Sequence, residues 1–210
     1  MWLRNKIKDK TFFDYIYFIG SMRARFVTSV FYTRFFKFIG KGTWIKSPDL
    51  IFNAQKIEVG DNVRVEKGAV LYSVRSYAGI NYNGRIIIGD GVFANRYFNV
   101  TAASLIQVGN NVAFGPNVFL NDSDHDYHDI NSSIIQSKLS IKGEIHIGDD
   151  SWIGANVFIT GGVTLGKHCV VAANSVVTKS FPDYSVIAGS PAILIKYFDI
   201  VNKEWVRVKK

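Results

Sequence analysis

The sequence contains almost no cysteine: Cys169 is the only one among 210 residues. A single cysteine cannot form an intramolecular disulfide, and it cannot build a cysteine-based zinc site by itself. Cys169 could accept an acyl group as a nucleophile, but its place in the repeat described below predicts a small, buried, structural side chain. We therefore expect a fold and a chemistry that do not depend on redox state.

Long apolar runs are also absent. The longest stretch without a formal charge, residues 97–121, contains asparagine, glutamine, serine, threonine and glycine, which a bilayer-spanning helix would not carry together. The N-terminal residues MWLRNKIKDK lack the continuous apolar segment and the cleavage site of a secretory signal. The sequence thus predicts a cytoplasmic protein without a transmembrane segment.

Net charge is nearly absent from the middle of the chain. Of the formal net charge of +8, residues 1–40 carry +6 and residues 203–210 carry +3, which leaves −1 for residues 41–202. A nucleic-acid-binding domain would spread basic side chains over its folded face, so we expect no nucleic-acid partner. Aromatic residues alternate with basic ones in residues 1–40, which predicts that this segment caps one end of the fold, contacts an anionic membrane, or does both.

A period of six residues governs the sequence from Ile147 onward. The blocks IGDDSW, IGANVF, ITGGVT, LGKHCV, VAANSV and VTKSFP each open on an aliphatic residue, and the fifth residue of the first five is small or β-branched. A helix would show a period of 3.6 and a simple amphipathic strand a period of 2, whereas a period of six fits short strands that turn a corner after each block. Three blocks would close one triangular coil of roughly 18 residues with the aliphatic side chains inside.

The repeat is interrupted at three places. Shorter tracts with the same pattern occur upstream of Ile147, and their spacing departs from multiples of one coil. These departures predict an insertion in residues 73–85, a small one near residues 102–107, and a loop over residues 121–144. A loop that projects from a stiff scaffold is a common place for function.

The flanking segments are predicted to be small extensions. Gly20 followed by Ser21 indicates that one helix ends and a second begins there, and Gly40 marks the end of the second helix. The YFDIVNKEW segment and the prolines before it suggest a turn and a closing hairpin. The expected organisation is a helical segment over residues 1–45, a solenoid over residues 46–182 and a C-terminal extension over residues 183–210.

Three motifs make residues 55–196 similar to the hexapeptide-repeat acyltransferases. They are FANRYFN, VAFGPNVFL followed closely by a histidine, and the tract from IHIGDDSW through VVTK to YSVIAGSPAILIK. The family includes maltose, galactoside and polysaccharide O-acetyltransferases. The resemblance implies an all-β, left-handed parallel β-helix that forms a homotrimer with active sites between subunits.

The resemblance also implies a reaction. Members of this family transfer the acetyl group of acetyl-CoA to a sugar hydroxyl, here in surface-polysaccharide, capsule or lipopolysaccharide assembly. The closest alternative is N-acetylation of a nucleotide-linked amino sugar. A non-catalytic β-helix scaffold is an alternative of a different class.

The catalytic residues of the family can be carried over by position. Its catalytic histidine corresponds to His125 and its substrate-site asparagine to Asn95. The histidine acts as general base on the acceptor hydroxyl, a role that suits an imidazole because it is mostly neutral at cellular pH. Asp124 or Asp126 could hold the second ring nitrogen of His125 at the substrate site. Trp152 is a candidate wall of the acceptor or CoA groove, although packing between subunits fits it nearly as well.

The cofactor-binding positions of the family correspond to Ala155, Ala173, Thr178 and Lys179. The resemblance implies that backbone groups of stacked coils hydrogen-bond the pantetheine arm and that the lysine meets a phosphate. The terminal segment departs from the family, because Ile193 occupies a position that is often basic. Lys196 therefore becomes the candidate for the remaining phosphate contact.

No metal is expected in this protein. The residues DHDYHD around His125 resemble a metal-binding pattern, but acidic and histidine side chains in a polar loop are more often simply solvated. A zinc carbonic anhydrase built on the same coil would need three histidines, including an H-x-x-x-x-H pair. The four histidines of this chain do not provide that pair.

Overall fold

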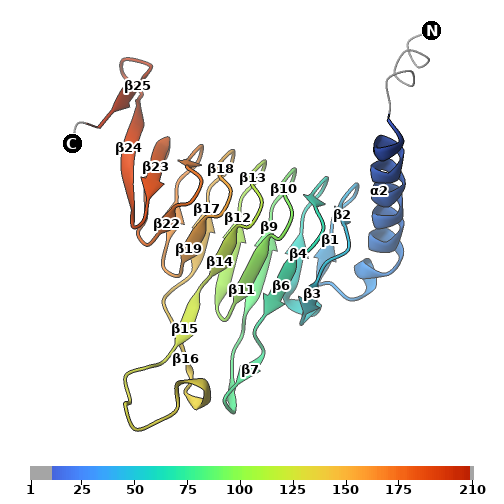
Figure 1. The fold of residues 1–210 in the computed structure, drawn as a ribbon, viewed down its shortest axis with the longest axis horizontal. Helices are drawn as coiled ribbons and strands as arrows, with labels where there is room; N and C mark the ends of the chain where they lie inside the picture. The colour runs from blue at the N-terminus through green and yellow to red at the C-terminus, as the bar shows by residue number, and fades with distance from the viewer. Residues whose placement is uncertain (1–10, 209–210) are drawn as a thin grey trace.

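A computed structural model describes residues 11–208, which form a three-sided prism closed at its N-terminal end by one helix (Figure 1). The three sides are sheets whose strands run parallel along the body of the prism, and we call them sheets A, B and C. Each turn of the chain around the prism contributes one strand to each sheet, so the coils stack along the prism axis. Within residues 11–208, no helix has the length and apolar character needed to cross a bilayer.

The strands are short and their order in each sheet follows the chain. Sheet A contains β1 (Phe38–Ile39), β4 (Ile57–Val59), β9 (Arg85–Ile88), β12 (Leu105–Val108), β17 (Ile145–Ile147) and β20 (Thr164–Leu165). Sheet B contains β2 (Trp44–Ile45), β5 (Arg64–Val65), β10 (Phe93–Ala94), β13 (Ala113–Phe114), β18 (Trp152–Ile153), β21 (Val170–Val171), β23 (Ser185–Gly189), β24 (Ala192–Asp199) and β25 (Glu204–Arg207). Sheet C contains β3 (Leu50–Phe52), β6 (Val70–Ser73), β11 (Asn99–Ala102), β14 (Phe119–Asn121), β19 (Phe158–Thr160) and β22 (Val176–Val177).

The remaining elements lie outside the three sheets. Two small hairpins are formed by β7 (Ser76–Tyr77) with β8 (Ile80–Asn81) and by β15 (Ser123–His125) with β16 (Leu139–Ile141). The helical elements are α2 (Phe12–Val30) and the short 3-10 helices η1 (Tyr32–Arg34), η2 (Ala54–Lys56) and η3 (Ile134–Gln136).

Stacked aliphatic side chains fill the interior of the prism, as the six-residue period predicted. The residues that open the six blocks are each at most 3% exposed: Ile147, Ile153, Ile159, Leu165, Val171 and Val177. Cys169 and Ser175, at the fifth position of their blocks, are fully buried. The coils therefore bury one continuous apolar core, because each coil covers the apolar residues of the next.

A ladder of asparagines supports the corner between sheets B and C. Asn117 donates a hydrogen bond to Asn156 at 3.1 Å, and Asn156 donates one to Asn174 at 3.0 Å. The three residues have φ values of 57°, 56° and 60°, in the left-handed region that asparagine tolerates better than most residues. The corner thus repeats with the same geometry from coil to coil.

Helix α2 is one continuous helix, so the prediction of two helices separated at Gly20 and Ser21 is wrong. The Ser21 hydroxyl donates to the Tyr17 carbonyl within the helix at 2.9 Å and does not cap a new one. Gly20 faces the prism, where an added Cβ would lie 3.4 Å from Cε of Lys46. The glycine therefore serves the close approach of the helix to the prism. The expected second helix is replaced beyond Val30 by η1 and β1.

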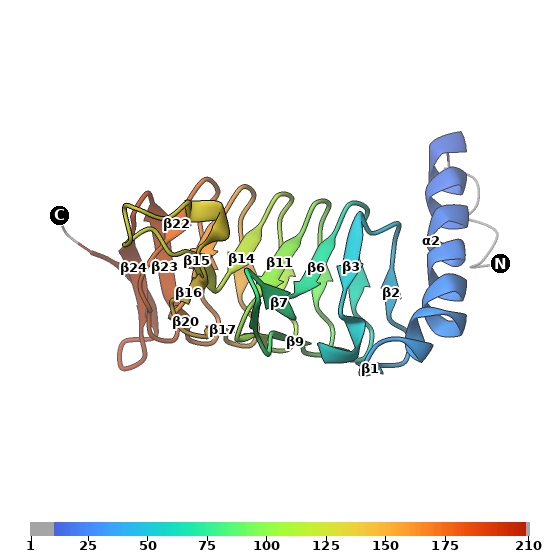
Figure 2. The same ribbon diagram turned by 90° about the horizontal axis from the view of Figure 1, so that it is seen from below.

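The helix closes the N-terminal end of the solenoid (Figure 2). Thr28 is buried, and its hydroxyl accepts a hydrogen bond from the Ile45 amide at 2.9 Å. Tyr17 donates a hydrogen bond to the buried carboxylate of Glu66. Nζ of Lys46 lies 3.6 Å from that carboxylate and 3.9 Å from the centroid of the Tyr17 ring. The helix therefore forms hydrogen bonds to polar groups of the first two coils.

The two hairpins leave the prism on the same side, below it in the view of Figure 1. The β7–β8 hairpin lies in the predicted insertion over residues 73–85, and β15 and β16 form the base of the predicted loop over residues 121–144. The hairpins are joined by two tyrosines. Tyr77 donates a hydrogen bond to the Ile135 carbonyl at 2.6 Å, and the Tyr82 hydroxyl accepts one from the Leu139 amide at 2.7 Å.

Candidate active site

A pocket of about 340 Å³ lies where the two hairpins join sheet C. Its floor comes from the outer face of sheet C, and its walls come from the two hairpins. The lining residues are Tyr72, Val74, Tyr77, Thr101, Asn121, Ser123, Asp124, His125 and Leu139. Two of the predicted site residues, Asp124 and His125, therefore share one pocket.

His125 lies at the end of β15, where its backbone pairs with Leu139 of β16. Its side chain is exposed, and its ring meets the ring of Tyr77 edge-on, with the centroids 5.2 Å apart and the planes at 64°. Within residues 11–208, no side chain forms a hydrogen bond to the His125 ring. Both ring nitrogens are thus available to a bound molecule or to a neighbouring subunit.

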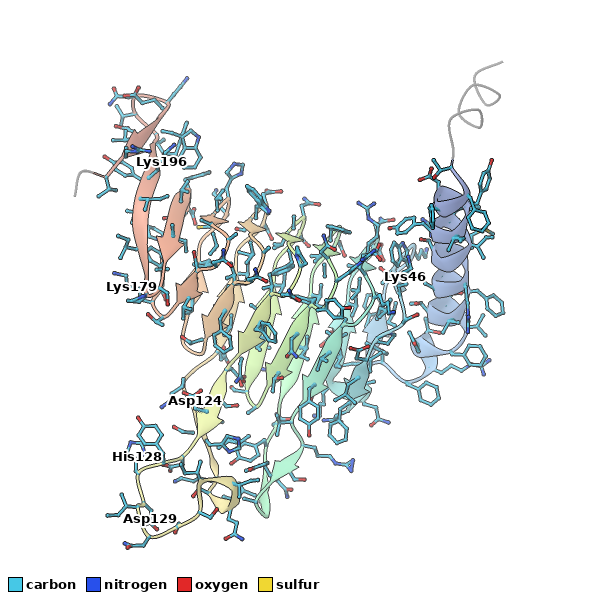
Figure 3. All side chains as sticks on the ribbon, in the orientation of Figure 1. Lys46, Asp124, His128, Asp129, Lys179 and Lys196 are labelled. Carbon is cyan, nitrogen blue, oxygen red and sulfur yellow. The ribbon has the colours of Figure 1, made fainter. Side chains whose placement is uncertain are left out.

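The two candidate acids beside His125 have different surroundings. Asp126 accepts hydrogen bonds from Nδ1 and the amide of His128, at 2.6 and 3.1 Å. The side-chain bond is the main reason why the pKa of the Asp126 carboxyl lies below its ordinary value. Asp126 is therefore engaged with His128, and Asp124 is the acid that lines the pocket with His125. Figure 3 shows Asp124 at the root of the loop and His128 and Asp129 farther out.

Asp122 is a buried acid at the root of the loop that the sequence analysis missed. Its carboxylate accepts hydrogen bonds from the backbone amides of Ala103 at 2.7 Å and Ser104 at 2.8 Å. Burial raises the pKa of this carboxyl, and the two backbone bonds oppose the rise. These bonds hold the start of the loop over residues 121–144 to the corner between β11 and β12. The one available signal was that Asp122 is the first charge after the uncharged stretch of residues 97–121.

A second group of predicted residues lies at the corner between sheets B and C. Asn95 follows β10, Ala155 follows β18 and Ala173 follows β21, so the three occupy the same corner of the prism, with the coil of β13 between Asn95 and the two alanines. Oδ1 of Asn95 accepts a hydrogen bond from the Arg96 amide at 2.8 Å. None of the three lines the pocket of His125.

The predicted residues Thr178 and Lys179 lie at the opposite edge of sheet C. They follow β22 and are exposed, and Figure 3 shows Lys179 on the side of the prism from which the loop over residues 121–144 leaves. Nζ of Lys179 lies 5.6 Å from the ring centroid of Phe181. Sheet C therefore separates the edge that carries His125 and Lys179 from the corner that carries Asn95 and the two alanines.

The last two predicted residues belong to neither group. Trp152 lies on the outer face of sheet B, with its side chain 58% exposed. Lys196 lies on β24 of the C-terminal hairpin, paired with Val186, and Figure 3 places it well away from Lys179. One chain thus does not bring all the predicted cofactor residues to one groove. Among the described residues, no three His, Cys, Asp or Glu side chains gather as a metal site requires.

Comparison with protein families gives one match within the repeat. Residues 144–179 match the model of the bacterial transferase hexapeptide (six repeats) family. The solved structure of AntD, an N-acyltransferase from Bacillus cereus in complex with dTDP and 3-hydroxybutyryl-CoA, has a TM-score of 0.64 and 20% identity. The match covers 79% of this chain and 85% of AntD. The predicted all-β, left-handed parallel β-helix is therefore confirmed.

Curated relatives carry the names of acetyltransferases. The chain is 30% identical over 167 residues to the probable acetyltransferase Rv3034c of Mycobacterium tuberculosis, covering 78% of this chain and 51% of the relative. It is 32% identical to galactoside O-acetyltransferase of Escherichia coli K12, covering 70% of this chain and 66% of that enzyme. It is 29% identical to WbbJ of the same strain, provisionally named a lipopolysaccharide biosynthesis O-acetyl transferase, covering 90% of this chain and 92% of WbbJ. The chain thus spans about half of the Mycobacterium relative and almost all of WbbJ.

Proposed function

Since the chain belongs to the bacterial hexapeptide-repeat transferases, we propose that it is an acetyl-CoA-dependent O-acetyltransferase acting on a sugar hydroxyl. The observation that carries this proposal is the exposed His125 ring inside a pocket with aromatic walls and a neighbouring carboxylate. The likeness to WbbJ over nearly its whole length supports a role in surface-polysaccharide or lipopolysaccharide assembly.

His125 is the general base of the proposed reaction. Its neutral imidazole takes the proton of the acceptor hydroxyl, and Asp124 at the same pocket stabilises the imidazolium that forms. The hydroxyl oxygen attacks the thioester carbonyl of acetyl-CoA directly, the C–S bond breaks, and CoA leaves as a thiolate that takes the proton held by His125. No acyl-enzyme is needed, and Cys169 is unsuited to form one because it is buried and burial raises the pKa of its thiol.

The residues at the edges of sheet C suit a CoA molecule. Lys179 is an exposed cation that would hold a phosphate of the donor. Ala155 and Ala173 are small residues at a regular corner, where backbone groups of successive coils would bond the pantetheine arm. Lys196 remains a candidate for a phosphate contact only if the C-terminal hairpin lies beside the donor of another subunit.

A homotrimer would bring the two edges of sheet C together. The outer face of this sheet carries two stacked aromatic pairs, Phe52 with Tyr72 at 4.8 Å and Phe119 with Phe158 at 6.3 Å between centroids. An exposed aromatic face of this kind is typical of a subunit interface. Around a threefold axis, the Asn95 corner of one subunit would meet the His125 edge of the next.

We also propose that helix α2 contacts the inner face of the cytoplasmic membrane. An apolar stripe on its outward side consists of residues that are between 43% and 73% exposed: Phe12, Tyr15, Ile19, Met22 and Phe26. Arg23 and Arg25 lie on the same helix, and their charges suit an anionic leaflet. Sedimentation with anionic liposomes should be lost when Arg23, Arg25, Arg34 and Lys37 are replaced by glutamine; wild-type protein that stays in solution would contradict this contact.

The experiment that tests the proposed function is a CoA-release assay with a panel of acceptors. Acetylation of a neutral glycoside, with the product identified by mass spectrometry, is the expected result. The likeness to AntD makes an amino-sugar nucleotide the competing acceptor, and transfer to its amine alone would indicate the N-acetyltransferase alternative. CoA release that no acceptor stimulates would contradict both reactions.

A further inference from the structure

The β7–β8 hairpin gives the site features that the hexapeptide repeat alone does not provide. It interrupts the repeat between β6 and β9, and it contributes Val74 and Tyr77 to the pocket that contains His125. The hairpin therefore forms one wall of the pocket. The loop over residues 121–144, which we call the catalytic loop, forms another.

Tyr77 contacts the catalytic loop at two places. Its ring edge meets the His125 ring at 5.2 Å, and its hydroxyl bonds the Ile135 carbonyl at 2.6 Å. Tyr82 holds the returning strand of the loop through the Leu139 amide at 2.7 Å. Because the loop projects from the prism and residues 11–208 provide no hydrogen bond to the His125 ring, the contact with Tyr77 restrains the position of that ring.

The size and charge of the pocket limit what it can bind. Its volume of about 340 Å³ is near the lower end for ligand pockets, which range from roughly 300 to 1,000 Å³. Of its nine lining residues, Asp124 carries a negative charge and none is lysine or arginine. A phosphate in this pocket would therefore lie beside a carboxylate without a lysine or arginine of the same chain to pair with.

The lining suits a single sugar ring. Tyr72 and Tyr77 offer aromatic surface to the apolar side of a pyranose, while Thr101, Asn121 and Asp124 offer hydrogen-bonding groups to its hydroxyls. We propose that the β7–β8 hairpin is a specificity element that shapes the acceptor site for one uncharged glycosyl ring, with Tyr77 as the positioning residue for His125. This inference rests on the proposed function and adds that a phosphate of the acceptor must remain outside the pocket.

Binding can be measured without catalysis, by saturation-transfer NMR with a panel of methyl hexopyranosides and the corresponding sugar 1-phosphates. We expect at least one methyl glycoside to bind, each sugar phosphate to bind less tightly than its methyl glycoside, and the Tyr77→Ala variant to bind the glycoside about 10-fold more weakly. The matched control is Tyr127→Ala, which removes an exposed tyrosine that lies near His125 in the chain but outside the pocket. Tighter binding of the phosphates, no binding of any methyl glycoside, or unchanged binding by Tyr77→Ala would overturn the inference.

Kinetics test the positioning role separately. Tyr77→Ala should lower kcat about 10-fold and raise the KM of the acceptor, while the KM of acetyl-CoA stays within about twofold. Tyr77→Phe keeps the ring but loses the hydrogen bond to Ile135. It should recover most of kcat, because the ring contact and not the hydrogen bond positions His125. Tyr77→Leu gives a second measurement if the alanine variant loosens the hairpin. A wild-type enzyme that binds a methyl glycoside but transfers no acetyl group would contradict the proposed function and leave the binding result standing.

Discussion

His125 lies on a projecting strand outside the apolar core, so its imidazole can be removed with little effect on folding. We expect His125→Ala to lower turnover by roughly 100-fold or more, because the acceptor hydroxyl loses its general base. Steady-state CoA release measures turnover, and a thermal melt should show a nearly unchanged midpoint.

His128 provides the matched control for this substitution. It is an exposed histidine of the same loop, but its Nδ1 is bonded to Asp126 and its side chain does not line the pocket. His128→Ala should therefore be much milder than His125→Ala. If His128→Ala lowered turnover more than His125→Ala, the general base would be His128 and the assignment to His125 would be wrong.

Cys169 is the one thiol of the chain, and its environment is that of a core residue. It is fully buried, and its Sγ lies 3.2 Å from the Pro182 carbonyl oxygen. Because burial raises the pKa of the thiol, the reactive thiolate is scarcer at neutral pH than for an exposed cysteine. We expect slow alkylation of the native protein and an active Cys169→Ala variant. Rapid alkylation with complete loss of activity, together with an inactive alanine variant, would point to a nucleophile instead.

Lys179 is the exposed cation at the edge of sheet C that carries the catalytic loop. Loss of one charge-assisted contact to a phosphate should raise the KM of acetyl-CoA by roughly 5- to 100-fold and leave the KM of the acceptor nearly unchanged. Lys167→Ala is the control, since Lys167 is also exposed but lies at another corner, with Nζ 4.0 Å from Asp183. An effect on acceptor binding alone would mean that the donor groove lies elsewhere.

At the scale of the elements, the attachment of helix α2 depends on a small polar cluster. The hydrogen bond to Glu66 is the main cause of the raised pKa of the Tyr17 phenol, so the phenol stays protonated and remains a donor to a higher pH than an ordinary tyrosine. Tyr17→Phe would remove the hydrogen bond to the buried Glu66 carboxylate and keep the ion pair with Lys46. The loss should lower the free energy of unfolding by about 1.5 to 3 kcal/mol.

We expect this loss of stability to appear as faster amide hydrogen exchange across α2, with little change in turnover because no residue of the helix lines the pocket. Tyr15→Phe is the matched control, because Tyr15 belongs to the outward stripe of the same helix. Equal exchange in the two variants would show that the cluster does not hold the helix.

The solenoid elements were predictable because their residues are repeated. Each coil buries an aliphatic residue at the same position, so a local period reports directly on the packing. The continuity of α2 at Gly20 was not predictable in this way, because it depends on contact with Lys46 in the first coil. A glycine that permits close packing and a glycine that ends a helix look alike in a sequence.

The candidate site was predictable only in part, for the same reason. His125 could be placed from its spacing to the FGPN motif, a local feature that resembles the family. Asp122 acts through amides 18 and 19 residues earlier in the chain, and Tyr77 bonds a carbonyl 58 residues later. Such pairings depend on which coils and hairpins meet in space, so only the folded structure identifies these two residues.

At the scale of the whole molecule, the separation of the two groups across sheet C leads to a test of assembly. If the proposed homotrimer forms, His125→Ala and Asn95→Ala trimers should both be nearly inactive, since each would lack one half of every site. If Asn95 of one subunit works with His125 of the next, each trimer that contains both variants has one complete site out of three, and activity should recover to about a third of the wild-type value. Co-expression with two different tags and tandem purification would yield such mixed trimers for the CoA-release assay. Mixed trimers as inactive as their parents would mean that the two residues do not share a site between subunits.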